Sequence, residues 1–147
     1  MEIKVSNKKA YYDYKILEEY CAGLCLQGSE VKVLKESKGS LVGAFCQVEN
    51  DGIWLIGSSI PENPDSSYNN HTENRKRKLL LNKKEIKDIT KEVEAKGKTI
   101  IPLQILMDSR GFLKLKIGIA QGQQVYEVLQ DLQIIQEQQE QQVQQAQ

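Results

Sequence analysis

The sequence has few of the residues from which covalent or metal-based scaffolds are built. Its 147 residues include three cysteines, Cys21, Cys25 and Cys46, and a single histidine, His71. The cysteines are odd in number and form no Cys-x-x-Cys pair, which argues against a disulfide framework and against a zinc site of ordinary spacing. We therefore predict reduced thiols in a cytoplasmic protein that holds no metal and no other cofactor.

Long apolar runs and catalytic motifs are also missing. No stretch approaches the roughly 20 apolar residues that a membrane-spanning helix needs, and charged residues follow Met1 in place of a signal-peptide pattern. No nucleophile is paired with a base, and no glycine-rich loop opens a helix. His71 lies in the polar stretch 57–76, where we expect it to be solvated. The sequence predicts neither a membrane protein nor an enzyme.

Positive charge is absent from the C-terminal part of the chain. All 20 Lys and Arg lie in residues 1–116, together with 16 Asp and Glu, whereas residues 117–147 hold four acids and no base. The body is therefore +4 and the tail −4. A basic body suits a polyanionic partner, because neutralised phosphates release counterions. The tail does not, and 13 of the last 31 residues are Gln.

Alternating apolar and polar residues predict a mainly β protein. Half-buried strands are indicated at 11–20, 22–35, 43–48, 53–56, 79–81, 99–107 and 112–119. The stretch 22–35 is predicted to hold two strands. In the stretch 22–35 the break falls at Gln27-Gly28-Ser29. Asp51-Gly52 predicts a tight turn, and Pro102 an edge or a bulge.

One helix has clear signals at both ends. Asn82 and Glu85 form a capping box, and Gly97 ends the helix. Short strands with one such helix and no βαβ rhythm predict an α+β fold: a small antiparallel barrel of the oligonucleotide-binding (OB) type with about six strands and flanking helices. We place this domain at residues 1–120. The Gln-rich tail, 121–147, is predicted to be disordered or conditionally helical.

Two groups of side chains are candidates for nucleic-acid contacts. Tyr11, beside Lys8 and Lys9, offers a ring on which a base can stack, or else packs in the core. The run 75–78, Arg-Lys-Arg-Lys, flanks an apolar strand and either binds phosphates or is only a solvated face. Trp54 is assigned to the core.

Five motifs, in order, resemble one protein family. They are NKKA at 7–10, AGLCLQGSEVKVLK at 22–35, RKLLLNKKEI at 77–86, GKTIIPL at 97–103 and KIGIAQG at 116–122. Together they resemble the SsrA-binding protein (SmpB) family, which escorts transfer-messenger RNA (tmRNA, or SsrA RNA) to stalled ribosomes. The resemblance implies an OB-like barrel that binds the tRNA-like domain of tmRNA. It also implies trans-translation, in which the unfinished protein is tagged for degradation.

The resemblance implies RNA contacts at the matching positions, in addition to Tyr11 and Arg75. These positions are Asn7, Lys8, Lys9, Gly23, Gly28, Arg77, Lys78 and Leu80. Arg77 would bind two phosphate oxygens with its planar fork, and Lys78 would act as a point charge. Leu80 would face away from Leu79 and either pack on a sugar or base or lie in the core.

Two departures from the family pattern change the expected contacts. Cys21 stands where the family usually has an acidic residue, and a thiol accepts hydrogen bonds from a base or 2′-hydroxyl only weakly. After Ala120 the family continues as a basic segment in the mRNA channel of the ribosome. Here Gly122 and Tyr126 fit that pattern but no cation follows. Contact with the decoding centre would then depend on stacking by Tyr126 and on amide hydrogen bonds.

Two hypotheses about function follow. The first is an adaptor without enzymatic activity that binds tmRNA and delivers it to stalled ribosomes. The second is a diverged OB-fold RNA-binding protein whose tail mediates protein association, because Val125, Leu129 and Leu132 begin a 4,3 spacing compatible with a thin helical seam. For both we expect no membrane contact and a monomer away from the ribosome.

Overall fold

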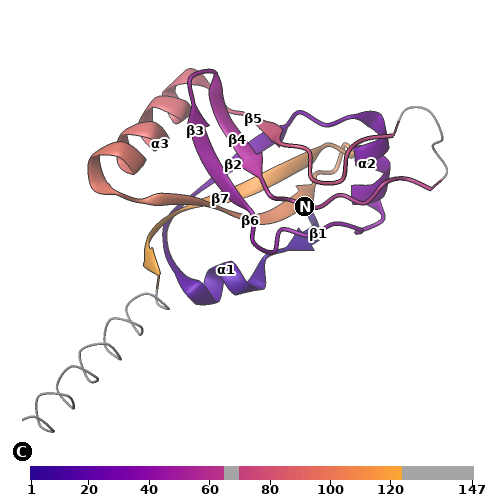
Figure 1. Cartoon of the computed structure of the whole chain (residues 1–147), viewed down its shortest axis with the longest axis horizontal. Helices are drawn as coiled ribbons and strands as arrows, with labels where there is room; N and C mark the ends of the chain where they lie inside the picture. Colours follow the sequence, from indigo (N-terminus) through magenta and orange to yellow (C-terminus); the bar gives the residue numbers. More distant parts are fainter. Residues whose placement is uncertain (65–69, 124–147) are drawn as a thin grey trace, which may run out of the picture.

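The computed structural model describes residues 1–64 and 70–123 and folds them into a closed antiparallel sheet (Figure 1). The elements are β1 (Glu2–Ser6), α1 (Lys8–Asp13), β2 (Tyr14–Leu24), α2 (Gly28–Lys35), β3 (Phe45–Glu49), β4 (Gly52–Ile56), β5 (Arg77–Leu80), α3 (Lys83–Lys96), β6 (Thr99–Met107) and β7 (Leu113–Gln123). The strands pair in the order β6-β3-β4-β5-β2-β7, and β7 pairs back onto β6. The predicted α+β barrel of six strands is confirmed, and β1 extends it beside β6.

The interior of the barrel is filled by the alternating side chains of its strands. In β7, Leu113, Leu115, Ile117 and Ile119 point inward and are buried, while the residues between them point out. The helices α2 and α3 lie at opposite ends of the sheet (Figure 1) and add buried side chains, including Ile89 of α3, to the same core. The period of two along each strand thus determines an inner and an outer face.

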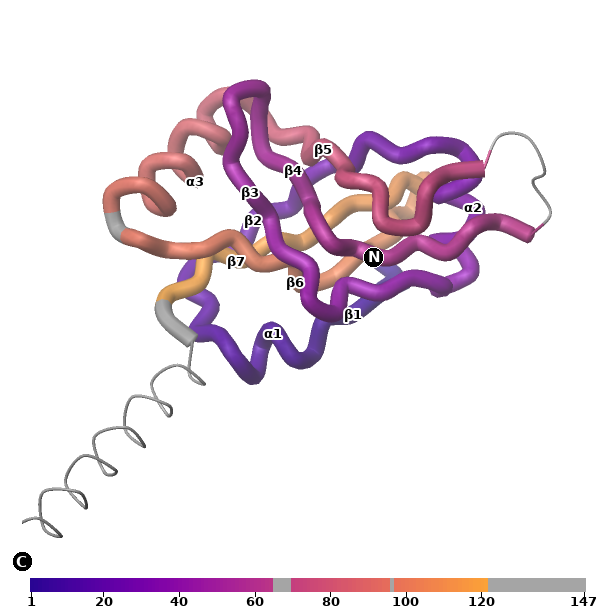
Figure 2. Tube along the Cα trace, in the orientation of Figure 1, coloured from indigo at the N-terminus to yellow at the C-terminus, as the bar shows by residue number. Residues whose placement is uncertain are grey.

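A second, smaller apolar cluster lies outside the barrel, where α1 covers the β6–β7 pair (Figure 2). Ala10 of α1 packs there with Leu103 and Ala120. Gly118 is essential to this contact, because a Cβ at that position would come within 2.9 Å of Ile16 Cγ2 and 3.0 Å of Leu103 Cδ1. The outer face of β7 is therefore apolar and covered near the C-terminal end of the strand. Nearer the N-terminal end of β7 this face is open to solvent.

The central stretch 22–35 does not form two strands, so this prediction is wrong. β2 ends at Leu24, and α2 begins at Gly28 with a reciprocal capping box between Gln27 and Glu30. The valines that alternate in the sequence lie on a helix, whose buried residues include Val33 and Leu34. A short apolar run fits both periods, and the capping box, which was not predicted, decides for the helix.

The N-terminal region is more ordered than the sequence suggested. Residues 2–6, which lie outside all the predicted strands, form β1 and pair with β6. The predicted strand 11–20 starts only at Tyr14, because Tyr11 and Tyr12 belong to α1. A helix of six residues is marginal by propensity alone. Its packing on β6 and β7 stabilises it here.

The remaining local signals are mostly confirmed. Asn82 and Glu85 form the predicted capping box of α3, and Gly97 ends that helix with φ 63°. A bulge against β7 follows Pro102. The β3–β4 turn differs in one detail: Glu49 pairs with Gly52, so the two loop residues are Asn50 and Asp51 rather than Asp51 and Gly52.

None of the helices in the described part of the chain is long and apolar enough to cross a membrane. Within residues 1–64 and 70–123, no three His, Cys, Asp or Glu side chains gather into a group that could hold a metal ion. β7 continues to Gln123, three residues beyond the predicted domain boundary at 120. The tail prediction concerns residues that lie almost entirely outside the described part.

Candidate nucleic-acid interface

The outer face of β5, β2 and β7 carries a strip of residues that are exposed or partly exposed to solvent within the described part of the chain. Gly23 of β2 pairs with Leu80 of β5 on one side and with Lys114 of β7 on the other, and Cys21 pairs with Lys116. Neighbouring residues point inward, as Ala22 and Leu115 show by their burial. We call Leu80, Gly23, Cys21, Lys114 and Lys116 the outer strip.

Leu80 is the apolar part of the outer strip. Its side chain is 55% exposed, whereas that of its neighbour Leu79 is 2% exposed, so the two face opposite sides as predicted. Gly23 lies beneath it, and a Cβ there would be 3.1 Å from Leu80 Cβ. The absence of a side chain on Gly23 lets β2 approach β5 closely and leaves Leu80 exposed, where it can pack on a sugar or a base.

The two lysines are the basic part of the outer strip. Lys116 Nζ lies 3.0 Å from Glu19 Oε2, and this hydrogen bond raises the pKa of Lys116. Lys114 Nζ is 3.8 Å from Asp108. Because Lys116 is partly exposed, its ion pair is weak enough to be exchanged for a phosphate. Both lysines lie on the polar face predicted for this strand but were not among the predicted contacts; their alternation with buried residues was the available signal.

α1 borders the outer strip with further candidate side chains. Lys8, Lys9 and Tyr12 are exposed, Tyr12 by 77%. Tyr11 is 41% exposed. Its pKa is raised mainly by partial burial and, to a smaller extent, by the nearby charge of Glu19. The helix therefore brings two lysines and two tyrosine rings to the edge of the strip.

Asn7 orients this helix and is itself buried. Its Nδ2 donates a hydrogen bond to the carbonyl oxygen of Pro102 at 2.9 Å, and its backbone N–H donates to Leu103 O at 2.8 Å. These bonds attach the start of α1 to the bulged part of β6. The geometry gives Asn7 a positioning role and leaves the exposed side chains of α1 as the available contacts.

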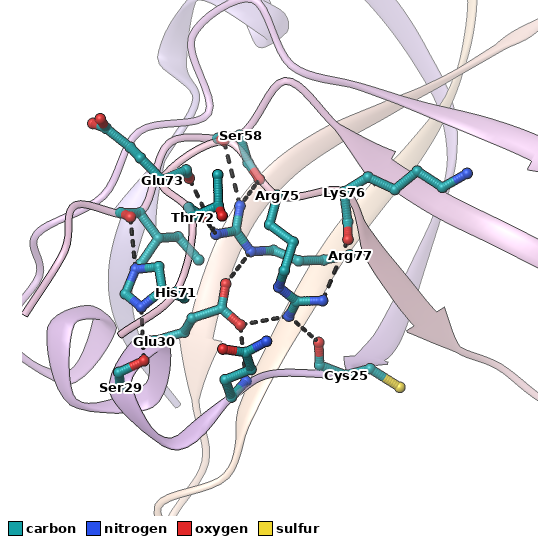
Figure 3. Close-up of polar contacts among 12 residues, drawn as sticks. Cys25, Ser29, Glu30, Ser58, His71, Thr72, Glu73, Arg75, Lys76 and Arg77 are labelled. Atoms are coloured by element: carbon teal, nitrogen blue, oxygen red, sulfur yellow. Dashed lines mark hydrogen bonds and ion pairs between the residues drawn. The ribbon is translucent and has the colours of Figure 1, made fainter. Parts of the chain in front are cut away.

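The run 75–78 does not present four cations on one edge, contrary to the prediction. Arg77 is fully buried, and its Nε donates to Glu30 while Nη1 donates to Ser58 Oγ at 2.9 Å (Figure 3). Arg75 donates to the other oxygen of Glu30 and to the carbonyl oxygen of Cys25. In this fold the guanidinium of Arg77 cannot bind two phosphate oxygens.

The carboxylate of Glu30 is the centre of this buried cluster. Burial raises its pKa, but hydrogen bonds from Arg75, from the Gln27 backbone and from Arg77 outweigh burial, and the net pKa is lowered. The pKa of Arg77 is lowered by burial, against the opposing effect of Glu30. The charged pair joins α2 to β5, so Arg77 stabilises the fold and is not available to RNA.

His71 belongs to the same structural region and is not solvated, so that expectation is wrong. It is 3% exposed, with Nδ1 2.8 Å from Ser29 Oγ and Nε2 2.8 Å from Ile60 O (Figure 3). It thereby connects the first turn of α2 to the stretch after β4. A polar sequence context did not reveal this, because the two partners are 42 and 11 residues away.

Trp54 is half-buried at the surface and not in the core, which corrects another prediction. Its Nε1 donates to Asp51 Oδ1 at 2.8 Å, and Lys76 Nζ lies 4.5 Å from the ring centre. Lys78 Nζ lies 5.9 Å from the same ring, and Lys76 is also bound to Glu49. Both lysines thus face the β3–β4 hairpin, and Lys78 borders the outer strip without belonging to it.

Three predicted positions lie away from the strip or outside the described residues. Gly28 is exposed in the first turn of α2, and a Cβ at that position would meet nothing within 4 Å. Gly122 lies in the last part of β7. Tyr126 lies outside the described residues.

A closed six-stranded barrel with an exposed basic and apolar strip defines the class as a small nucleic-acid-binding barrel protein. Comparison with known sequences then identifies the family. The SmpB protein family matches residues 4–147, and the chain belongs to that family.

Relatives and a solved structure agree with this assignment. The chain is 43% identical to the SsrA-binding protein of Thermosipho africanus, over 89% of this chain and 88% of the relative. It is 40% identical to the SsrA-binding protein of an Arthrobacter species, over 88% and 82%. A chain from a solved structure described as "tmRNA-SmpB: a journey to the center of the bacterial ribosome" superposes with a TM-score of 0.68 at 41% identity, covering 83% of this chain and 85% of that one.

Proposed function

We propose that this protein binds the tRNA-like domain of tmRNA through the outer strip and α1, and delivers that RNA to stalled ribosomes for trans-translation. The observation that carries the proposal is Leu80, exposed above Gly23 and flanked across the sheet by Lys114 and Lys116. The membership of the SmpB family, with relatives that are SsrA-binding proteins, supports this choice of RNA. The protein acts in the cytoplasm, as a monomer away from the ribosome.

The chemistry of the strip matches a folded RNA. Lys114 and Lys116 supply charge for phosphates, and the lysines of α1 extend that charge along the edge. Leu80 and the ring of Tyr11 or Tyr12 supply apolar surface for a sugar or an unstacked base. Cys21, which pairs with Lys116 across the sheet, is an exposed thiol and makes only weak hydrogen bonds.

The protein acts by binding and not by catalysis. The buried charges of Glu30 and Arg77 are already paired with each other, and His71 is bound to Ser29 and Ile60. Gly122 and Tyr126 remain our proposed contacts with the ribosome. Without cations in the tail, that contact depends on stacking and on amide hydrogen bonds, and it should respond less to salt than a basic tail would.

The test is a measurement of affinity for a tRNA-like fragment of tmRNA across a salt series. Changing Lys114 and Lys116 to Gln should reduce the slope of log affinity against log salt by about 0.7–0.9 for each lost contact. Leu80→Ala should weaken binding about tenfold and leave the slope unchanged, because it removes apolar contact of roughly one buried side chain.

A matched control is Lys32→Gln, which removes one exposed positive charge from α2, an element that contributes no residue to the outer strip. It should change affinity and slope little. Equal effects of Lys116→Gln and Lys32→Gln would show that only the net charge matters. Full affinity of the Leu80→Ala variant would contradict the proposed location of the interface.

A further inference from the structure

An open groove lies away from the outer strip, between α3, β3 and the start of β6. Its volume is about 440 Å³, and its lining includes the apolar side chains of Phe45, Val48, Val93 and Ile101. It exists because β3 and β6 pair only at Cys46 and Ile100 before they diverge. Phe45 remains 45% exposed at its edge.

The described chain ends beside this groove. Gln123, the last residue of β7, pairs with Tyr14, which itself lines the groove. Ala120 pairs with Thr99, another lining residue, directly after the end of α3. Both β7 and α3 end on the left of the barrel in Figure 1. The last described residue, Gln123, therefore lies at the rim of the groove, and the sequence that follows needs no linker to reach it.

The sequence that follows has the pattern of a segment with one apolar face. Val125, Val128, Leu129 and Leu132 recur at i, i+3, i+4 and i+7, the spacing of a helix that buries one side. Eight helical residues would span about 12 Å, and the two residues from Gln123 to Val125 bridge about 7 Å. A segment with such an apolar face, attached at Gln123, can therefore reach the apolar lining of the groove.

Charge favours the same arrangement. The segment carries Glu127 and Asp131 and no cation. Lys98 borders the groove but is paired with Glu92 at 2.6 Å, so the available cations are Lys87 and Lys91, which are exposed on the adjoining face of α3. Glu94 also lies at the rim and opposes the attraction, so the apolar contact must supply most of the affinity.

From these observations we propose that residues 125–132 dock as an amphipathic helix in the groove between α3, β3 and β6 of the same molecule. Attachment at Gln123 gives the segment an effective concentration on the order of mM, so a weak intrinsic affinity is enough to keep it docked. The tail then has a defined resting position in the free protein. It must leave the groove before it contacts another partner.

The test uses backbone amide NMR spectra of the full chain. Leu129→Asp should shift the signals of the groove residues in β3 and at the start of β6. Gln130→Asp introduces the same charge on the opposite face of the segment and should leave those signals unchanged. Both substitutions lie outside the barrel, so the fold is preserved for the comparison.

The reciprocal variant changes the groove instead of the tail. Phe45→Gln should shift the signals of residues 125–132, whereas Phe112→Gln, the same change at another exposed phenylalanine, should not. Groove signals that are identical in the Leu129→Asp variant and the unchanged protein would overturn the proposal. So would groove shifts that disappear on dilution, because they would mean that the tail binds a second molecule. Neither result would affect RNA binding by the outer strip.

Discussion

The buried ion pair between Glu30 and Arg77 allows a quantitative test of how this barrel is held together. Both side chains are fully buried, and Glu30 also binds Arg75, whose side chain is 28% exposed. Replacing Glu30 with Gln keeps the size of the side chain but leaves the Arg77 guanidinium buried without a counter-charge. Breaking a buried pair in this way costs about 3–5 kcal/mol of the free energy of unfolding.

The measurement is urea unfolding of the Glu30→Gln variant beside the unchanged protein. Glu36→Gln is the matched control, because Glu36 follows the same helix and is paired with Lys38 on the surface, with both side chains more than 60% exposed. An exposed pair contributes at most about 1 kcal/mol. If Glu30→Gln cost no more than Glu36→Gln, the pair would not be the structural link between α2 and β5.

The same carboxylate predicts a dependence of stability on pH. The pKa of Glu30 is lowered in the folded protein, so its ionised form contributes stability above the ordinary value near 4.5. That stability is lost as the pH falls through the lowered value. The unfolding free energy should therefore decrease on acidification, and it should decrease less in the Glu30→Gln variant. Equal pH dependence of the two proteins would refute the reasoning.

Three further substitutions test contacts inside the fold by the same unfolding measurement. Gly118→Ala should cost about 1–3 kcal/mol, because its Cβ would come within 2.9 Å of Ile16 Cγ2; no loss would show that β2 shifts freely. Gly28→Ala, in open space within α2, should be neutral or stabilising by up to about 1 kcal/mol. His71→Ala should lower the free energy of unfolding by about 1–3 kcal/mol, because it leaves the Ser29 hydroxyl and the Ile60 carbonyl unpaired. A decrease no larger than that of a surface substitution would contradict the buried position of the ring.

The family and the class of fold were predictable because they depend on local pattern and on motif order. Alternation located β6 and β7, and the capping box of Asn82 and Glu85 located α3. The same rules failed at 28–35, where a short run of valines suits both a strand and a helix. They also failed at α1, a helix that exists because it packs on β6 and β7.

The candidate interface was predictable only in part. Leu80 and Tyr11, for which the sequence left a core position open, are exposed, whereas Arg77 and Asn7 were taken for surface contacts and are buried. A basic motif does not show which of its cations are paired inside the protein. Arg77 is separated by 47 residues from Glu30, and no local rule predicts a partner so distant in sequence.

What the sequence alone determined is the set of strands with a strong period, the capped helix, the contrast of charge between body and tail, and the family. These follow from the spacing of residue types within a few positions. The tertiary structure alone decided which charges face solvent, that Lys114 and Lys116 join Leu80 on one strip, and that the chain leaves β7 beside a groove. The physical reason is that closing the barrel brings together residues far apart in the chain, and burial then forces the charged ones among them to pair.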